Sequence, residues 1–306
     1  MQTKNIYLEW MEQYEAFGVA DNVVEGIVSG GCVPIITLKN EDYEKLECDL
    51  PKENAPTVGF LMGREKGHYT IDFDYAKAIA QSNVKMRFLT YGENVVQMEG
   101  LDGIILPGGA FDSPNEFYTD PLKKGRGVPG ERSFAYVSSV MTAKEAKMPI
   151  LGVCAGAQIV GGMHGMKMFR SIDEYMDAEI EHKTKNRDAH EISVYKNSPL
   201  YQMLGQEKLV VNSRHRECMV RGVGESKLSI YALSEDGIPE AWGSEKENIL
   251  CVQWHPENFA SKGDEKMQKI YNWVANRARI YKRQNEAKRF MKKAANIFFI
   301  SAEKNR

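Results

Sequence analysis

The sequence lacks the features that mark secreted, membrane-spanning and cysteine-rich zinc proteins. Its five cysteines are scattered and form no CxxC pair, which argues against a disulfide framework and a cysteine-based zinc site. No apolar run reaches 18 residues, and the first residues, MQTKNIYLEW, contain no apolar segment followed by a small-residue cleavage site. We therefore expect a cytoplasmic protein with reduced thiols and no membrane segment.

An excess of charge of either sign is also missing. Forty basic residues stand against 42 acidic ones, giving a formal net charge of -2, so no global field attracts nucleic acid or anionic lipid. The 42% hydrophobic and 27% charged fractions exclude the disordered and collagenous classes. With 306 residues, the chain has room for one large α/β domain with appendages or for two small domains.

Short apolar runs alternate with amphipathic stretches from Thr57 onward, a pattern typical of βαβ units and a mainly parallel sheet. The predicted strands of this part are 58–62, 84–90, 103–106 and 150–153. The predicted helices are 72–82, 132–146 and one that begins at Cys154. Each parallel strand therefore has a helical crossover available to it.

The pattern changes on both sides of this alternating part. Between Ile172 and Val252, short alternating segments with turn signals predict more antiparallel sheet. Helical periodicity without Pro or Gly over 266–298 predicts one or two closing helices. We expect an αβ extension (1–55), a main domain (56–276) and a basic C-terminal helix (277–306).

A glycine-flanked cysteine, GVCAG (152–156), follows an apolar strand and precedes a predicted helix. Glycines permit the sharp strand-to-helix turn that exposes a strained nucleophile above a sheet. A helix N-terminus beside the sulfur also favours the reactive thiolate. The alternative is a buried cysteine in a glycine-rich turn, and the pentapeptide alone does not decide between the two.

A second motif, QWHPE (253–257), follows the apolar strand 249–252. Residues two apart in an extended segment point the same way, so His255 and Glu257 are predicted to lie side by side. They can then serve Cys154 as base and orienting carboxylate. A lone histidine near a strand end is more often structural, but the cysteine and the carboxylate together favour a catalytic triad.

A third motif, LPGG (106–109), ends a predicted strand. Its glycines let backbone N–H groups approach a ligand, and one of them with the N–H of Ala155 can form an oxyanion hole. Pro-Gly is also common in ordinary type II turns. The motif by itself favours the ordinary turn.

These three motifs, in this order and at these separations, resemble the class I glutamine amidotransferase superfamily, whose members carry a PGG oxyanion loop, a G-x-C-x-G elbow and an HPE element. The resemblance runs from Thr57 to Ala275. Within the superfamily the chain is most similar to the γ-glutamyl-γ-aminobutyrate hydrolase group. The similar segments are LPGGAFDSPNEFY (106–118), AHEISVYKNSPLYQMLG (189–205), VNSRHRE (211–217) and PEAWGSEKENILCVQWHPE (239–257).

The resemblance implies a flavodoxin-like three-layer α/β sandwich with a mainly parallel central sheet and an additional antiparallel portion. It implies a cysteine-dependent hydrolase of γ-glutamyl amide bonds that requires no cofactor and no metal. Cys154 becomes the nucleophile, His255 the base and Glu257 the orienting carboxylate. Gly109 and Ala155 become the oxyanion donors. The predicted substrate-binding residues are Gly108, Gln158, Ser213, Arg214 and His215.

The chain departs from the group around the predicted pocket. The group usually has Arg after the nucleophile and His-Gln after NSxH, whereas this chain has Ala155 and Arg216-Glu217, with Arg214 inside the motif. An arginine there can bind a substrate carboxylate bidentately, or it can be a solvated loop charge. The amine part of the substrate is therefore left open.

Two other functions compete with free-standing γ-glutamyl hydrolysis. One is a glutaminase subunit that passes ammonia to a synthase, which the absence of a synthetase domain and of a G-x-x-x-x-G-K-[ST] motif weakens. The other is a non-catalytic binding or regulatory protein, against which the intact Cys, His and Glu argue.

The expected ligand is a small γ-glutamyl compound, with no nucleic acid and no membrane as partner. The basic tail is amphipathic, and we expect it to pack on its own domain or on a second subunit of a homo-oligomer rather than on a membrane or another protein.

Overall fold

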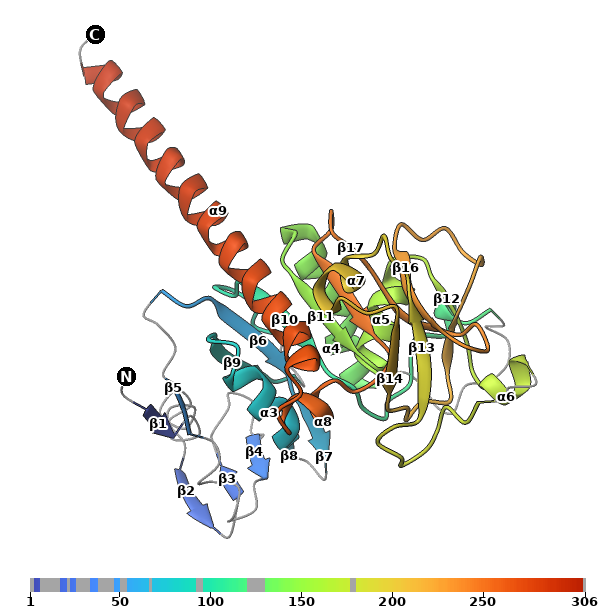
Figure 1. Cartoon of the computed structure of the whole chain (residues 1–306). Helices are drawn as coiled ribbons and strands as arrows, with labels where there is room; N and C mark the ends of the chain where they lie inside the picture. The colour runs from blue at the N-terminus through green and yellow to red at the C-terminus, as the bar shows by residue number, and fades with distance from the viewer. Residues whose placement is uncertain are drawn as a thin grey trace.

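A computed structural model describes residues 54–65, 68–91, 96–119, 130–176 and 180–304 of the chain, and five short strands before them (Figure 1). Those five strands are β1 (Thr3–Asn5), β2 (Phe17–Ala20), β3 (Val23–Glu25), β4 (Pro34–Thr37) and β5 (Glu47–Asp49). The predicted extension over 1–55 falls largely outside the described residues. Its boundary with the main domain stays a prediction.

A nine-stranded mixed sheet forms the centre of the molecule, in the order β14-β13-β16-β17-β18-β11-β10-β6-β9. The strands from β18 to β9 are parallel, and those from β14 to β18 are antiparallel. The parallel strands are β6 (Thr57–Leu61), β9 (Lys85–Leu89), β10 (Gly103–Leu106), β11 (Ile150–Val153) and β18 (Ile249–Val252). The remaining strands are β13 (His190–Val194), β14 (Lys208–Val211), β16 (Ser229–Ser234) and β17 (Pro239–Ser244).

The burial of these strands explains why some of them are continuous apolar runs in the sequence and others alternate between apolar and polar residues. All four residues of β10, β11 and β18 are buried, as expected for parallel strands that are covered on both faces. In β14, buried and exposed residues alternate, which is the pattern of a strand with one wet face. The predicted α/β fold with a mainly parallel core and an antiparallel portion is confirmed.

Helices cover the parallel strands (Figure 1). Helices α4 (Glu131–Ala146) and α5 (Ala155–Met163) pack on each other, and α3 (Phe73–Ala80), α8 (Glu257–Ala260) and the start of α9 form a second group. Asp72 caps α3, because its side chain accepts the N–H of Asp74 at 2.9 Å. Short elements complete this part: η1 (Asn115–Phe117), α6 (Ile172–Tyr175) and α7 (Pro199–Leu204).

Three smaller sheets accompany the central one in the described part of the chain. Strands β2, β3 and β4 join β8 (His68–Ile71) and β7 (Gly63–Glu65) in a five-stranded sheet, in which β4 and β8 are parallel. Strand β12 (Lys167–Phe169) pairs with β15 (Cys218–Val220) beside the central sheet, and β1 pairs with β5. The β4–β8 pairing ties the N-terminal strands to the main domain.

The predicted closing helix is one continuous helix, α9 (Glu265–Lys304). Its first turns are buried on one face, because the apolar residues Met267, Ile270, Tyr271, Val274 and Ala278 recur at helical spacing. Ile270 and Tyr271 are fully buried. Farther along, Phe290 and Met291 are exposed, and the helix extends away from the domain (Figure 1). No helix in the described part of the chain is long and apolar enough to cross a membrane.

Candidate active site

Cys154 lies in the tight turn between β11 and α5, with φ 50° and ψ -114°. This conformation is unfavourable for a residue with a Cβ, so the surroundings must enforce it. The flanking glycines make it feasible: a Cβ on Gly156 would lie 2.1 Å from the carbonyl oxygen of Leu106, and one on Gly152 would lie 2.8 Å from Cα of Ala157. The thiol is 8% exposed, at the edge of a cleft.

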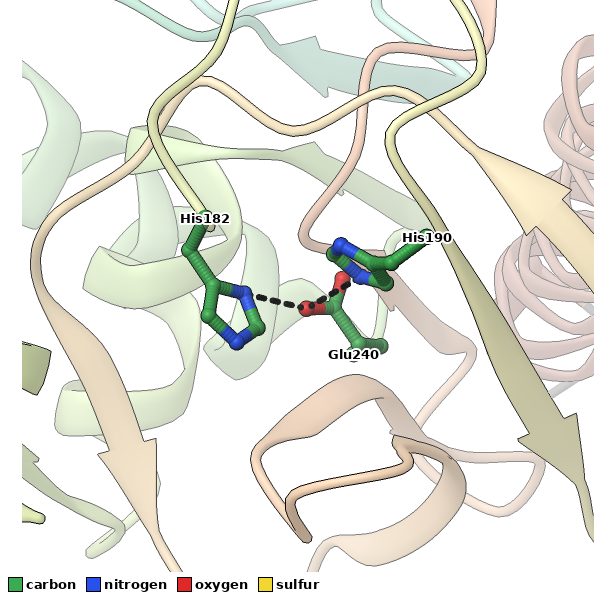
Figure 2. Close-up of side chains that lie close together, drawn as sticks. All are labelled: His182, His190 and Glu240. Carbon is green, nitrogen blue, oxygen red and sulfur yellow. Dashed lines mark ion pairs between the residues drawn. The ribbon is translucent and has the colours of Figure 1, made fainter. Parts of the chain in front are cut away.

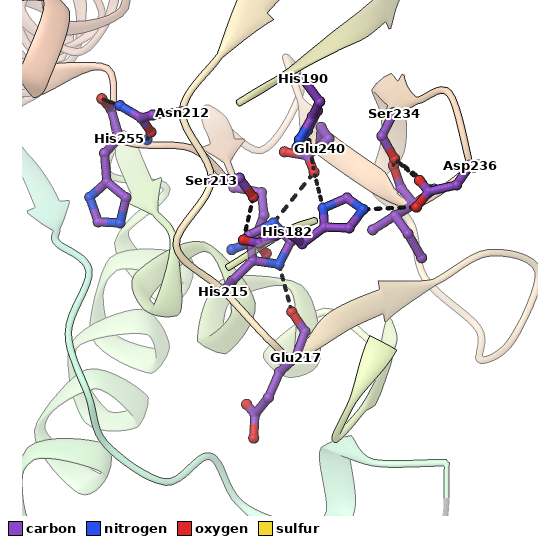
Figure 3. Close-up of polar contacts among 12 residues, drawn as sticks. His182, His190, Asn212, Ser213, His215, Glu217, Ser234, Asp236, Glu240 and His255 are labelled. Carbon is purple, nitrogen blue, oxygen red and sulfur yellow. Dashed lines mark hydrogen bonds and ion pairs between the residues drawn. The ribbon is translucent and has the colours of Figure 1, made fainter. Parts of the chain in front are cut away.

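His255 lies beside this cysteine, just after β18. Both residues flank Gly108, since a Cβ there would lie 2.8 Å from Cε1 of His255 and 3.1 Å from Cβ of Cys154. The backbone of His255 is held twice by Asn212, which accepts the His255 N–H at 2.8 Å and donates to its carbonyl at 2.9 Å (Figure 3). The imidazole is thus positioned at the sulfur by the turn after β14.

Glu257 holds the far side of the imidazole. Its Oε1 lies 2.6 Å from Nδ1 of His255, and its Oε2 accepts the hydroxyl of Tyr271 at 3.1 Å. The carboxylate is 2% exposed, so Tyr271 and His255 are the groups that compensate its burial. The arrangement has the order nucleophile, imidazole, carboxylate.

The electrostatics of this group favour a charged imidazole. Burial lowers the pKa of His255, but the charge of Glu257, and next the sulfur of Cys154, outweigh it and raise the pKa to about 10. Burial also raises the pKa of Tyr271 well above its ordinary value, as does the nearby Glu257. Tyr271 therefore stays a phenol that donates to the carboxylate, and His255 carries a proton near neutral pH.

The LPGG turn is held by hydrogen bonds to an aromatic and a cationic side chain. The N–H of Gly108 donates to the Tyr75 hydroxyl at 3.0 Å, and Arg132 donates to the carbonyl of Gly108 at 2.9 Å. A side chain at Gly109 would require the Arg132 guanidinium to move, because a Cβ there would lie 2.4 Å from it. Within the described part of the chain, no protein acceptor takes the N–H of Gly109 or Ala155.

A cleft of about 590 Å³ opens over these groups. It is lined by Gly109, Ala110, Phe111, Asp112, Cys154, Ala155, Gln158, Lys183, Arg214, His215, Arg216, Glu217 and His255. Among the predicted substrate-binding residues, Gln158, Arg214 and His215 line this cleft, and Gly108 lies beside Cys154 and His255. Three cationic side chains, those of Lys183, Arg214 and Arg216, are part of this lining.

Ser213 occupies a different place from the other predicted pocket residues. It is fully buried, and its hydroxyl donates to the carbonyl of His182 at 2.6 Å instead of facing the cleft. Gln158 lines the cleft, but its amide nitrogen donates inward to the side chain of Gln253 and to the carbonyl of Glu217, at 3.1 Å each. Both residues tie the loop after β14 to the core.

Sequence reasoning missed several residues of this site. Tyr271 and Arg132 come from helices, and no local motif marks them as neighbours of the triad. Asn212 could have been predicted, because it belongs to the segment VNSRHRE (211–217), which carries part of the family resemblance. Lys183 and Arg216 line the cleft only because of how their loops are folded.

A protein-family model described as Peptidase C26 matches residues 63–257, more than half of the chain. The match ends at Glu257 and includes Cys154 and His255.

Two of the curated relatives each match more than half of the chain. A protein of Lactococcus lactis subsp. lactis named as glutamine amidotransferase-like is 31% identical over 161 residues; the match covers 51% of this chain and 66% of that protein, just under two thirds. The γ-glutamyl-CDP-amidate hydrolase of Campylobacter jejuni is 25% identical over 211 residues, covering 68% of this chain and 76% of that protein.

A solved structure supports the fold. The crystal structure of a glutamine amidotransferase from Thermotoga maritima matches with a TM-score of 0.51 and 11% identity, covering 74% of this chain and 98% of that one. At this identity the match shows shared architecture, which is the flavodoxin-like arrangement of the central sheet and its helices.

Proposed function

The chain belongs to the peptidase C26 family, within the class I glutamine amidotransferase-like proteins, and on this basis we propose that it hydrolyses γ-glutamyl amide bonds of small molecules. The observation that carries the proposal is the strained Cys154 beside an imidazole that Glu257 holds at 2.6 Å. Family membership alone supports amide-bond hydrolysis. The name of the Campylobacter relative supports γ-glutamyl amides as the substrate class.

The first half-reaction forms a thioester. With its proton held on His255, the Cys154 sulfur attacks the γ-carbonyl carbon as a thiolate, and the carbonyl oxygen becomes an oxyanion. The N–H groups of Gly109 and Ala155 are the donors we assign to that oxygen. The imidazolium of His255 then gives its proton to the leaving nitrogen, the C–N bond breaks, and the amine departs.

The second half-reaction restores the enzyme. Water enters where the amine left, His255 takes one of its protons, and the resulting hydroxide attacks the thioester carbonyl. The C–S bond breaks, the Cys154 sulfur leaves as a thiolate beside protonated His255, and glutamate departs after its new carboxyl group releases a proton to solvent. Glu257 takes no proton in either step and holds the imidazole in the orientation that both proton transfers need.

Substrate selection is assigned to the charged wall of the cleft. Arg214, Arg216 and Lys183 can pair with substrate carboxylates, and guanidinium groups do so bidentately. We assign the binding of the α-ammonium group of a glutamyl unit to the carboxylate of Glu217, which lines the cleft and accepts the Tyr118 hydroxyl at 2.9 Å. We therefore expect substrates with a free α-amino acid end.

The test is a panel of γ-glutamyl amides, with alkylamines, amino acids and nucleotides as amine parts, and with glutamine included. We expect glutamate release from at least one γ-glutamyl amide and a glutamyl adduct on Cys154 by intact mass spectrometry. The Cys154→Ala variant should show neither, while the Cys218→Ala variant, which changes a buried cysteine outside the cleft, should retain both. If no member of the panel is cleaved and no adduct forms, the proposal is wrong.

A second candidate function is a glutaminase subunit that delivers ammonia to a synthase. The similarity to the Lactococcus glutamine amidotransferase-like protein favours it. The two functions are separated by the same panel, because a glutaminase subunit cleaves glutamine in preference to larger γ-glutamyl amides. Glutamine hydrolysis that appears only after a second protein is added would favour this alternative.

A further inference from the structure

A cluster of three histidines and one glutamate is buried next to the active-site cleft but outside the triad (Figures 2 and 3). His182 lies on the loop before β13, His190 begins β13, His215 lies on the loop after β14, and Glu240 lies on β17. None of the four is more than 8% exposed, and Glu240 is fully buried. The proposed hydrolysis gives this cluster no role.

The three imidazoles converge on one oxygen atom of Glu240. Oε1 of Glu240 lies 3.4 Å from Nδ1 of His182, 3.4 Å from Nε2 of His190 and 3.4 Å from Nε2 of His215. These four atoms are all buried, and none has a hydrogen-bond partner among the described residues. Buried polar atoms almost always have a hydrogen bond, so three nitrogens that face one carboxylate oxygen at ion-pair distance, with no hydrogen bond formed, indicate a missing ligand.

We propose that this cluster is a structural zinc site, with His182, His190 and Glu240 as ligands and His215 as the fourth. Imidazole nitrogens and a carboxylate oxygen are a donor set that suits Zn²⁺. Ligand atoms around a tetrahedral zinc ion, about 2.0–2.1 Å from it, lie roughly 3.3–3.4 Å from one another. The three nitrogen-to-oxygen distances already have this spacing, and the ligand atoms of His182, His190 and Glu240 all lie within 4.8 Å of one another.

The outer nitrogens of two histidines are held as metal ligands require. Nε2 of His182 lies 2.9 Å from the carboxylate of Asp236, and Nδ1 of His215 lies 2.9 Å from the carbonyl of Glu217 (Figure 3). A carboxylate or carbonyl on the outer nitrogen fixes the tautomer, so the inner nitrogen presents its lone pair to the ion. Asp236 is itself held by the hydroxyl of Ser234.

Zinc and protons compete for the same nitrogens, because an imidazole must be neutral to donate its lone pair to the ion.

The ion would hold one wall of the cleft in place. The carbonyl of His182 accepts the hydroxyl of Ser213 and, at 3.0 Å, the N–H of His215. Arg214 and Arg216, which line the cleft, flank His215 in the chain. Because all four ligands are protein side chains, the site leaves no open position for substrate, and its role is structural.

The first test is the metal content of the full-length protein. We expect about one zinc ion per chain by inductively coupled plasma mass spectrometry, as for a structural site. After removal of the metal with a chelator, Co²⁺ should bind and give the intense visible absorption of tetrahedral cobalt. Neither measurement depends on a variant that folds.

The second test uses matched variants. His190→Ala and Glu240→Gln should lose the zinc, while His164→Ala should retain it. His164 is a fair control because it too is buried and has one unpaired ring nitrogen, but it lies in a different part of the molecule, at the end of α5. Zinc-free protein that binds neither Zn²⁺ nor Co²⁺ overturns the proposal and leaves a buried group of histidines ion-paired with Glu240. Zinc content unchanged in both cluster variants overturns it as well.

Discussion

Cys154 and His255 depend on neighbours that contribute shape and charge rather than chemistry. Gly152 and Gly156 allow the tight turn in which Cys154 has a positive φ, since a side chain at Gly156 would collide with the carbonyl of Leu106. Glu257 contributes the charge that keeps His255 protonated. The reactivity of the thiol is therefore a property of the packed turn and not of the cysteine alone.

Replacing Glu257 with Gln tests that charge. We expect kcat/KM to fall roughly 10³- to 10⁴-fold, because a neutral amide neither stabilises the imidazolium nor fixes its tautomer. In the wild type, kcat/KM should decline as pH rises through about 10, where His255 loses its proton. In Glu257→Gln this decline should begin at lower pH, because the attraction that raised the pKa is gone. The measurement is the pH profile of kcat/KM.

Tyr271→Phe is the matched control for this change. It removes one hydrogen bond to the carboxylate but leaves the charge, so its alkaline limb should stay near that of the wild type. The same pKa predicts a stability effect: His255 contributes stability fully below its ordinary value of 6.5, and that contribution is lost as pH rises through about 10. An identical alkaline limb in Glu257→Gln and wild type would contradict this account of His255.

Helix α9 has two parts with different physical roles. Its first turns pack on β10 and α8 and supply Tyr271 to the triad, whereas Ile280 is already 47% exposed. On either side of Ile280, two basic residues still bind the domain. Arg279 donates to the carbonyls of Ser82 and Asn83, and Lys282 donates to the carbonyl of Ala55. The buried part belongs to the domain, and the basic continuation extends beyond it.

Two isoleucines of this helix separate the two roles. Ile270→Ala should lower the free energy of unfolding by about 2–5 kcal/mol, because a fully buried side chain is replaced by a cavity. Ile280→Ala should cost less than about 1 kcal/mol, because half of that side chain is already in water. Urea unfolding of both variants measures the difference. Similar losses at the two positions would show that the exposed part is covered in solution.

The whole molecule is joined by long-range contacts between its parallel and antiparallel parts. Strands β13 and β17 belong to the antiparallel part, and they carry two of the four residues of the histidine cluster. The loops after β14 and before β13 carry the other two. A metal ion bound at this cluster links segments that are distant in the sequence, so it stabilises the folded state over the unfolded one.

Removal of the metal should therefore lower the thermal stability of the whole domain. A ligand that binds only the folded state at 100 times its Kd adds about 2.7 kcal/mol, and chelation removes that contribution. We expect the Tm of the wild type and of His164→Ala to fall with chelator and to recover with zinc. The Tm of Glu240→Gln should respond to neither. Differential scanning calorimetry makes the comparison, and a wild-type Tm that ignores chelation would contradict it.

Local spacing in the sequence was enough to predict much of this molecule. Buried parallel strands are continuous apolar runs, and α9 has apolar residues at helical spacing, so both could be predicted from neighbouring residues. The glycines around Cys154 and the two-residue spacing of His255 and Glu257 are equally local. The positions of the three motifs at the ends of strands could likewise be predicted, because each motif directly follows an apolar run in the sequence.

Only the tertiary structure decided which distant side chains meet. No metal site was expected, because the cysteines form no CxxC pair. No sequence pattern linked His182, His190, His215 and Glu240, since strand pairing and two loops bring them together. Ser213 was predicted to line the pocket, but the loop after β14 places its hydroxyl on a backbone carbonyl. Tyr271 reaches Glu257 only through the packing of α9. Local sequence specifies elements and their buried faces, whereas register and packing decide where polar groups converge.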